Sequence, residues 1–305
     1  MSSKKNVVIS VYSPIGGQGV SLIASQVVHL FAKHGPSCLL DLNLDQSISI
    51  YYLGKDPQTE FRHSALSSDE ETSKLSSFAI NIEANYYAVG VPLLGYGHFA
   101  EDPEEAMKEL LDQCKGEFNY TVIDLPHPFH VDITRKALAM SDLVLILIAD
   151  TEYAARAALK LNQLIATGNS KLNSARVKIV LNNRTGSTDL ALPKLLLGIS
   201  AVISPIVHSQ WSTISQNIAI LLIAVFALVA PALQAIVLLV HQASQYRRGP
   251  KLLKEKHVSI FHEFPNDAKT CMWSISQSTF FPEHSRIAAS LSVLCEKIRK
   301  ELNLT

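Results

Sequence analysis

The stretch "VYSPIGGQGVSLIASQ", residues 11–26, joins two different local patterns. The β-branched run "NVVISVYS" (6–13) is typical of a buried strand, and Val20 to Lys33 has the apolar spacing of a helix. A glycine-rich loop between them directs backbone N–H groups and the positive end of the helix at one point, which suits phosphate. The stretch therefore predicts a phosphate-binding loop. A tight strand-to-helix turn without a ligand stays open as the alternative.

Short apolar runs alternate with helical patterns along much of the chain. The expected strands lie at 37–45, 85–92, 119–126, 142–150 and 176–184, and the expected helices at 102–116, 133–140 and 152–166. Strands that are apolar throughout and alternate with helices indicate a parallel sheet covered on both faces. We therefore expect an α/β fold with a doubly wound, mainly parallel sheet. The polar residues 55–84 are interpreted as a surface excursion.

The charge balance of the chain limits its partners. Lys and Arg together number 27, as do Asp and Glu, so the formal net charge is zero. A surface that binds nucleic acid usually appears as an excess of basic residues. We therefore expect no nucleic acid among the partners.

The cysteines are widely spaced and form no CxxC pair: Cys38, Cys114, Cys271 and Cys295. This usage is typical of reduced thiols in a cytosolic protein, and buried packing is favoured over metal ligation. The N-terminal residues "MSSKKNVVISV" show no signal-peptide architecture. Both observations favour a domain on the cytoplasmic side.

Two further motifs accompany the glycine loop: "LLDLNLDQSISIYYLG" (39–54) and "YTVIDLPHP" (120–128). Together the three resemble the MinD/ParA family of deviant Walker A ATPases. Within that family they are most similar to the pilus-assembly proteins of Flp/Tad secretion systems, the CpaE/TadZ type. The similarity covers residues 6–184, and it resumes near Val258 and runs to the C-terminus. It implies a P-loop NTPase fold, with ATP and magnesium as ligands.

The resemblance maps a nucleotide site onto the loop, whose family pattern is KGGxGK[ST]. Gly16, Gly17 and Gly19 match the glycines, and Gln18 takes the variable position. Ser21 matches the hydroxyl residue that ligates magnesium.

Both lysines of that pattern are replaced. The first, which in the family reaches across a dimer to the partner's nucleotide, falls on Ile15. The second, which grips the β- and γ-phosphates, falls on Val20. Any homodimer of this chain is therefore expected to form without ATP.

Polar residues at the ends of three expected strands complete the mapped site. Asp41 matches the first acid of the second-strand motif, and Asn43 stands where the family has the acid tied to the attacking water. Asp124 matches the acid that supports the metal through water, and Asn182 the residue at the adenine edge. An acid that ends a buried run is costly unless it is used. For Asp41 and Asp124 a structural hydrogen bond is the alternative to metal support.

The replaced residues change the chemistry that the resemblance implies. Phosphoryl transfer depends on positioning and on cations placed where charge develops. Loss of one electrostatic donor costs about 10²–10³ in rate in comparable sites. With two lysines and one carboxylate replaced, we expect no catalytic residues, weak or no binding of ATP and magnesium, and essentially no turnover.

Two other groups of residues are candidates for a functional role. His127, His130 and Asp132 lie close together after an expected strand, but no third spaced ligand accompanies the histidines, so solvated loop residues are favoured over a metal site. The C-terminal helix, 285–302, is expected to pack on the core rather than bind a membrane. Its apolar stripe consists of Ile287, Leu291, Leu294, Ile298 and Leu302.

An apolar insertion interrupts the similarity, so residues 1–186 and 257–305 are expected to form the P-loop domain and 187–256 the insertion. Ile218 to Val240 carries no charge and is long enough, at about 34 Å of helix, to cross a bilayer. The strand ending near Asn182 and the strand beginning near His257 should belong to one sheet. The insertion must therefore cross a membrane twice, dip in and return, or stay out as a buried helix.

The flanking charges favour a transmembrane hairpin within residues 190–240. A second span is available at about Leu190 to Val207, and the connector between the spans carries no Lys, Arg, Asp or Glu. Cytoplasmic flanks of membrane spans are enriched in Lys and Arg. Lys194 lies near the start of the second span and must extend to the interface. With it, basic residues lie at both ends of the pair: Arg184, Lys194, Arg247, Arg248, Lys251, Lys254 and Lys256.

The leading hypothesis is a non-hydrolysing MinD/ParA-like protein at the cytoplasmic face of a bacterial inner membrane. It would help to localise or assemble the Flp/Tad pilus secretion machinery. The first alternative is an active ParA/MinD-type partitioning ATPase, which Ile15, Val20 and Asn43 disfavour. The second is a membrane-anchored scaffold without a nucleotide role.

Overall fold

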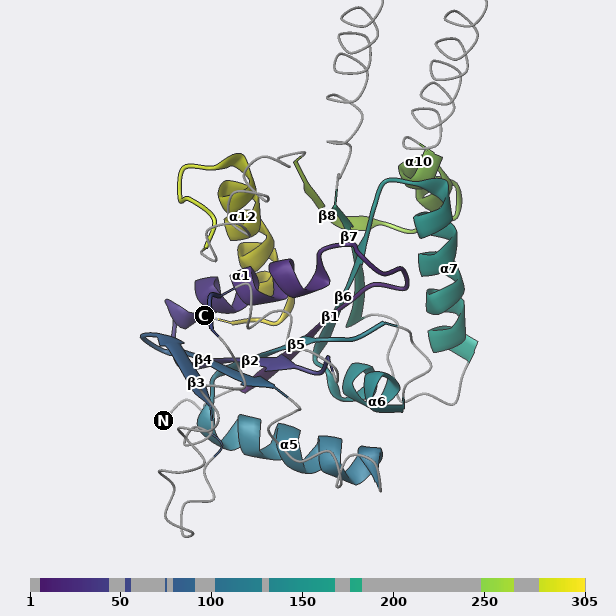
Figure 1. Cartoon of the computed structure of the whole chain (residues 1–305). Helices are drawn as coiled ribbons and strands as arrows, with labels where there is room; N and C mark the ends of the chain where they lie inside the picture. The colour runs from purple at the N-terminus through teal and green to yellow at the C-terminus, as the bar shows by residue number, and fades with distance from the viewer. Residues whose placement is uncertain are drawn as a thin grey trace, which may run out of the picture.

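An eight-stranded sheet runs through the molecule and carries helices on both faces (Figure 1). This computed structural model describes residues 6–43, 53–55, 75, 79–90, 102–127, 132–167, 176–182, 248–265 and 280–304. The strand order is β3-β4-β2-β5-β1-β6-β7-β8. The strands are β1 (Val7–Tyr12), β2 (Ser37–Asp41), β3 (Ile80–Glu83), β4 (Tyr86–Gly90), β5 (Tyr120–Asp124), β6 (Leu143–Ile148), β7 (Val177–Asn182) and β8 (Ile260–Phe264).

The helices divide between the two faces of the sheet. They are α1 (Val20–Ala32), α5 (Pro103–Glu117), α6 (Asp132–Met140), α7 (Glu152–Thr167), α10 (Arg248–Glu255) and α12 (Arg286–Glu301). Side chains of α1 and α12 share one apolar cluster, and those of α5, α6, α7 and α10 share the other. Successive side chains of a strand point to opposite faces. Accordingly Val7, Ile9 and Val11 of β1 pack toward α1, whereas Val8 and Tyr12 pack toward α5 and α6.

The predicted doubly wound, mainly parallel sheet is confirmed. All neighbouring strands of the described sheet pair in parallel except β3 and β4. The adjacent strands β1 and β5 are followed by helices on opposite faces, α1 and α6. Such a reversal opens a crevice at the carboxyl ends of the two strands, where α/β folds bind ligands.

The strand after the insertion joins the same sheet as the strand before it, as predicted. β8 pairs in parallel with β7, so that Asn182 is opposite Phe264. Helix α10 also packs on the domain, because Gly249 N–H donates to the carbonyl oxygen of Asp150 at 3.2 Å and Leu253 is fully buried. A Cβ on Gly249 would lie 2.6 Å from the carbonyl oxygen of Thr151, so only glycine permits this contact. The sheet domain thus includes residues 248–256, which the sequence analysis assigned to the insertion.

The insertion itself, residues 187–247, lies outside the described residues. Among the helices that the structure describes, none is both long and apolar enough to span a bilayer. The predicted hairpin at 190–240 therefore stays a prediction.

Strand β3 lies within the stretch interpreted as a surface excursion. It pairs antiparallel with β4 at the edge of the sheet, and the turn between them places Asn85 in the left-handed region with a φ of 62°. Outside β3, that stretch is described only at Lys55, Leu75, Ala79 and Ala84. The interpretation of 55–84 as a surface excursion was therefore wrong for the four residues of β3.

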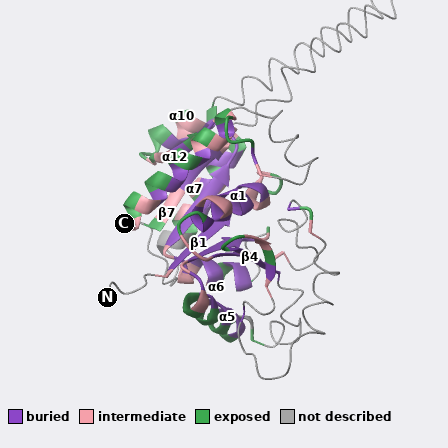
Figure 2. Cartoon of the chain, turned by 90° about the vertical axis from the view of Figure 1, so that its left-hand side faces the viewer, coloured by how far each residue is buried: buried purple, intermediate pink, exposed green. Residues whose placement is uncertain are grey.

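The predicted core-packing role of the C-terminal helix is confirmed. Ser285 caps α12 by accepting a hydrogen bond from Ala288 N–H at 3.2 Å, and the helix contacts α1 and β8. Burying an aliphatic side chain contributes about 1.5–3 kcal/mol to folding. The buried stripe of α12 consists of Ile287, Leu291, Leu294, Cys295 and Ile298. Figure 2 shows the exposed outer side of this helix in green.

Three of the cysteines are free and buried, as predicted: Cys38, Cys114 and Cys295. Burial raises the pKa of the Cys295 thiol to about 12. Burial, together with a hydrogen bond from Cys114, raises the pKa of Cys38 well above its ordinary value. Because the thiolate is the reactive form, these cysteines act as packing residues. Cys271 lies outside the described residues.

Candidate functional site

A cavity of about 450 Å³ lies at the carboxyl ends of β1, β2 and β5, where the topology predicts a crevice. Its walls come from the glycine loop, from Asn43 after β2, and from the loop after β5. The lining residues are Ser13, Ile15, Gly16, Gly17, Gln18, Gly19, Val20, Ser21, Asn43, Leu125 and His127. The structure thus brings together the loop residues that the sequence predicted.

The backbone of the loop has the shape expected of an anion-binding turn. Gly17 and Gly19 have φ of 74° and 84°, values that strongly favour glycine. Gly19 is the N-cap of α1, and no side chain caps this helix end. The first N–H groups of a helix have no intrahelical partner and carry a partial positive charge. Ser21 lies in this first turn and lines the cavity.

Both positions that carry lysine in the resemblance provide apolar packing here. Ile15 is half-buried against the cluster beneath α5, α6 and α7, and Val20 against the cluster shared by α1 and α12. Within the cavity lining that the structure describes there is no Lys, Arg, Asp or Glu. The described lining at the phosphate end of the cavity therefore offers backbone dipoles and no lysine or arginine.

Gln18 ties the loop to the sheet, a role that sequence reasoning missed. Its side-chain oxygen accepts a hydrogen bond from Ala149 N–H at 2.8 Å, just beyond β6. Its carbonyl oxygen accepts one from Asn182 Nδ2, also at 2.8 Å, at the end of β7. Asn182, matched by resemblance to an adenine contact, thus directs its amide nitrogen to the glycine loop.

Asn43 links the two acids at the strand ends. β2 and β5 pair so that Asp41 lies opposite Asp124, and both acids are fully buried. Asn43 Nδ2 lies 2.7 Å from Asp41 Oδ1 and 3.1 Å from Asp124 Oδ2, and Asn43 N–H also donates to Asp41 Oδ1. Neither acid lines the cavity, whereas Asn43 does. In the MinD/ParA resemblance the position of Asn43 carries an acid. In this chain the Asn43 amide instead donates to Asp41 and Asp124.

Tyr86 begins β4, opposite Ser37, and packs in the apolar cluster that includes α1. Tyr86 is fully buried, and its hydroxyl donates to the carbonyl oxygen of Ser25 in α1 at 3.1 Å. Burial raises its pKa well above the ordinary value, with further contributions from Cys38, Glu83, Asp124 and Asp41. Tyr86 therefore stays a neutral hydrogen-bond donor to α1.

The histidines after β5 are only partly described. His127 is exposed and lines the cavity, and its Cδ2 atom lies 3.9 Å from the position of a Cβ on Gly16. His130 lies outside the described residues, and Asp132 begins α6 and pairs with Arg135. No group of three metal-binding side chains occurs in the part of the chain that the structure covers.

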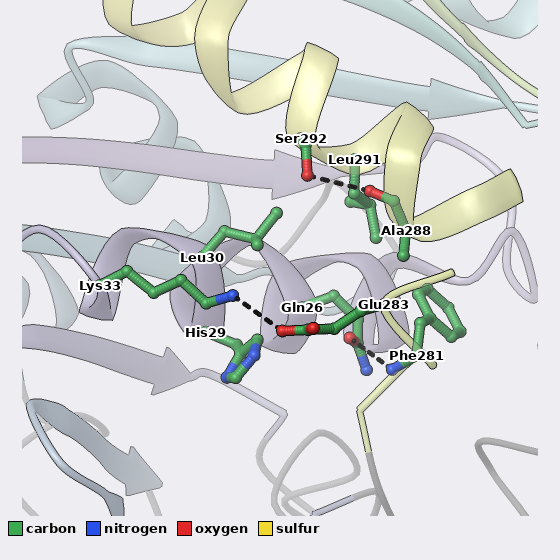
Figure 3. Close-up of a pocket in the computed structure, with 9 residues that line it drawn as sticks. All are labelled: Gln26, His29, Leu30, Lys33, Phe281, Glu283, Ala288, Leu291 and Ser292. Atoms are coloured by element: carbon green, nitrogen blue, oxygen red, sulfur yellow. Dashed lines mark hydrogen bonds and ion pairs between the residues drawn. The ribbon is translucent and has the colours of Figure 1, made fainter. Parts of the chain in front are cut away.

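A second, smaller cavity of about 150 Å³ lies between α1 and α12, away from the glycine loop (Figure 3). Lys33 and Glu283 approach each other at 3.7 Å across it, and Gln26 accepts a hydrogen bond from Phe281 N–H. Ligand pockets usually measure about 300–1,000 Å³. We interpret this cavity as a packing gap.

The larger cavity has groups that suit the phosphates and metal ion of a magnesium nucleotide, but its described lining lacks groups that the reaction uses. The left-handed glycines, the uncapped start of α1 and Ser21 suit phosphate oxygens and a metal ion. The apolar Ile15 and Val20 and the amide Asn43 supply neither the cations nor the carboxylate that phosphoryl transfer uses.

Solved structures of ParA and MinD proteins share this fold. The ParA family ATPase from Chlorobium tepidum TLS is 13% identical, with a TM-score of 0.62 over 95% of this chain and 99% of that one. The cell division ATPase MinD from Pyrococcus furiosus is 16% identical, with a TM-score of 0.61 over 97% and 99%. A putative plasmid partition protein from Borrelia burgdorferi B31, bound to AMPPNP, is 16% identical, with a TM-score of 0.60 over 97% and 100%. No family model and no curated protein matches the chain. The chain therefore has the MinD/ParA-type P-loop fold.

Proposed function

We propose that this protein is a MinD/ParA-like protein that binds the phosphates of ATP weakly and does not hydrolyse ATP. The main support is the cavity at the glycine loop, because none of its described lining residues is Lys, Arg, Asp or Glu. Two proteins with similar folds were crystallised with nucleotide, the Borrelia burgdorferi protein with AMPPNP and MinD from Pyrococcus horikoshii OT3 with Mg-ADP.

The residues present support binding better than catalysis. Backbone N–H groups at Gly17 and Gly19 and the start of α1 would contact phosphate oxygens, and Ser21, which lines the cavity, would contact magnesium. Asp124 is buried behind the lining, so it would support the metal only through water. A bound magnesium ion would neutralise part of the phosphate charge. Catalysis also needs cations at the developing charge and a group that positions water. Ile15 and Val20 are packed among apolar side chains, and Asn43 donates to Asp41 and Asp124.

The cellular role proposed is assembly or localisation of a Flp/Tad-type pilus machine at the cytoplasmic face of the bacterial inner membrane. Its support is the sequence resemblance in the three motifs, and the uncharged run Ile218 to Val240 as a means of membrane attachment. Loss of pili in a deletion strain, restored by the full-length chain, tests this role. Normal piliation together with unstable plasmid or chromosome inheritance would favour a partitioning protein instead.

The proposed lack of hydrolysis is tested by phosphate release from Mg-ATP. We expect the wild-type protein to release no more phosphate than Gly19→Asp, because aspartate at a φ of 84° distorts the loop and opposes phosphate. Titration with ATP in the same buffer should give weak binding that Gly19→Asp abolishes. Turnover that Gly19→Asp removes would identify an active ATPase. Absence of binding in both proteins would identify a scaffold without a nucleotide role.

A further inference from the structure

Gln18 is held at three points although it lies between two left-handed glycines. Its side chain accepts from Ala149 N–H, 131 residues away in the chain, and its carbonyl accepts from Asn182, 164 residues away. Gln18 Nε2 also approaches the carbonyl oxygen of Gly16 at 3.3 Å. These contacts join the middle of the glycine loop to the carboxyl ends of β6 and β7.

The contact with Asn182 determines the orientation of one peptide group in the loop. In a trans peptide the C=O of one residue and the N–H of the next point in opposite directions. Because the Gln18 carbonyl is directed to Asn182, the Gly19 N–H points away from Asn182. By the same argument, the contact at the Gly16 carbonyl sets the direction of the Gly17 N–H.

Such restraint matters more in this chain than in a loop with lysines. Glycine populates left-handed and right-handed conformations about equally, so Gly17 and Gly19 alone leave the loop many shapes. None of the described residues that line the cavity is a lysine, so backbone N–H direction dominates the contribution of these residues to phosphate affinity. A loop that is held in one shape before binding loses less entropy when it binds.

We propose that Asn182 and Gln18 are positioning residues that hold the glycine loop in its phosphate-binding shape. Asn182 then acts on the loop and not on the base, so the site recognises a polyphosphate chain with little selection among bases. This inference rests on the proposed binding of nucleotide, and it adds that the class of ligand recognised is a polyphosphate.

The test compares isosteric variants by amide hydrogen exchange and by binding. Asn182→Asp replaces the donor by an acceptor, which repels the Gln18 carbonyl, and Asn81→Asp is the matched change at an exposed strand residue. Gln18→Met removes the acceptor for Ala149 N–H, whereas Gln18→Glu keeps one. The ligands are ATP, GTP and inorganic pyrophosphate.

We expect Ala149 N–H to exchange roughly two- to tenfold faster in Asn182→Asp and in Gln18→Met, the effect of one net hydrogen bond. It should be unchanged in Asn81→Asp and Gln18→Glu. Asn182→Asp should weaken ATP, GTP and pyrophosphate by the same factor, again roughly two- to tenfold.

Two results would overturn the inference: unchanged exchange at Ala149 in both test variants, or a loss of affinity confined to ATP. The second result would assign Asn182 to the adenine edge. If the wild-type protein binds none of the three ligands, the proposed nucleotide binding fails, and the exchange data alone decide whether Asn182 and Gln18 restrain the loop. If Asn182→Asp does not fold, Gln18→Met against Gln18→Glu carries the exchange test.

Discussion

Asn43 is an amide that bridges two buried acids on adjacent strands. Asp41 and Asp124 are fully buried on adjacent strands, and Asn43 Nδ2 donates to both. A primary amide has two N–H donors, so it can serve two acceptors at once. In the MinD/ParA ATPases that the sequence motifs resemble, the corresponding residue is an acid tied to the attacking water. Here the same position stabilises the strand ends.

Removing this amide should therefore destabilise the fold. We expect Asn43→Ala to lower the free energy of unfolding by about 2–4 kcal/mol, because two hydrogen bonds to buried acids are lost while the acids remain. Urea denaturation of wild type and variant measures the difference, with Asn81→Ala as the exposed control. A loss below about 0.5 kcal/mol would mean that other partners suffice for the acids.

The glycine loop could be predicted at the residue scale, but the contacts that hold it could not. A turn is predicted from residue type alone, because three glycines follow the strand closely: Gly16, Gly17 and Gly19. The bonds of Gln18 depend on Ala149 and Asn182, which reach the loop only after two parallel strands have paired beside β1. Neither the spacing nor the type of these residues shows that pairing.

At the scale of the elements, continuous apolar runs predicted the central strands, since strands buried on both faces need no alternation. Edge elements follow other rules. β3 is polar on its outer side and joins β4 through the left-handed Asn85, so it resembles the polar residues before it. α10 is short and mostly exposed, and its attachment depends on Gly249 fitting against the backbone after β6. The sequences of β3 and α10 therefore do not show that these elements belong to the domain and not to a surface excursion or an insertion.

His262 on β8 makes the packing of α12 sensitive to acid. It is 6% exposed, lies 2.8 Å from the Ser290 hydroxyl on α12, and burial, then the charge of Lys297, lowers its pKa to about 4. An unfolded histidine titrates near 6.5. Between about pH 6.5 and 4 the unfolded chain therefore binds more protons than the folded one, so the free energy of unfolding falls as the pH falls.

Replacing His262 should remove this part of the acid sensitivity. Between pH 7.5 and pH 5 we expect the wild type to lose about 2 kcal/mol more than His262→Gln. Chemical denaturation at both pH values measures the difference, and His284→Gln, at an exposed position, should behave like the wild type. Equal losses in the wild type and His262→Gln would show that His262 is protonated in the folded protein without penalty.

In the whole molecule, the chain on either side of the insertion meets the sheet at the carboxyl ends of neighbouring strands. Asn182 ends β7, and Gly249 binds the carbonyl oxygen of Asp150 just beyond β6. Because β6 and β7 are parallel, these points lie at the carboxyl edge, where the glycine loop also lies. A chain that leaves and returns at one edge suits an even number of membrane crossings. The pairing of β7 with β8 requires the same, since both strands must stay on one side of any membrane.

The predicted hairpin can be tested with an introduced cysteine. We expect the full-length protein to sediment with membranes and resist carbonate extraction, because Ile218 to Val240 carries no charge. Ser212→Cys, in the connector, should react in intact cells with a membrane-impermeant thiol reagent, in a background where Cys271 is replaced. Ser292→Cys, exposed on α12, is the matched control and should react only after the cells are opened. A carbonate-soluble protein whose Ser212→Cys variant stays unlabelled in intact cells would show that the insertion is a buried helical elaboration of the domain.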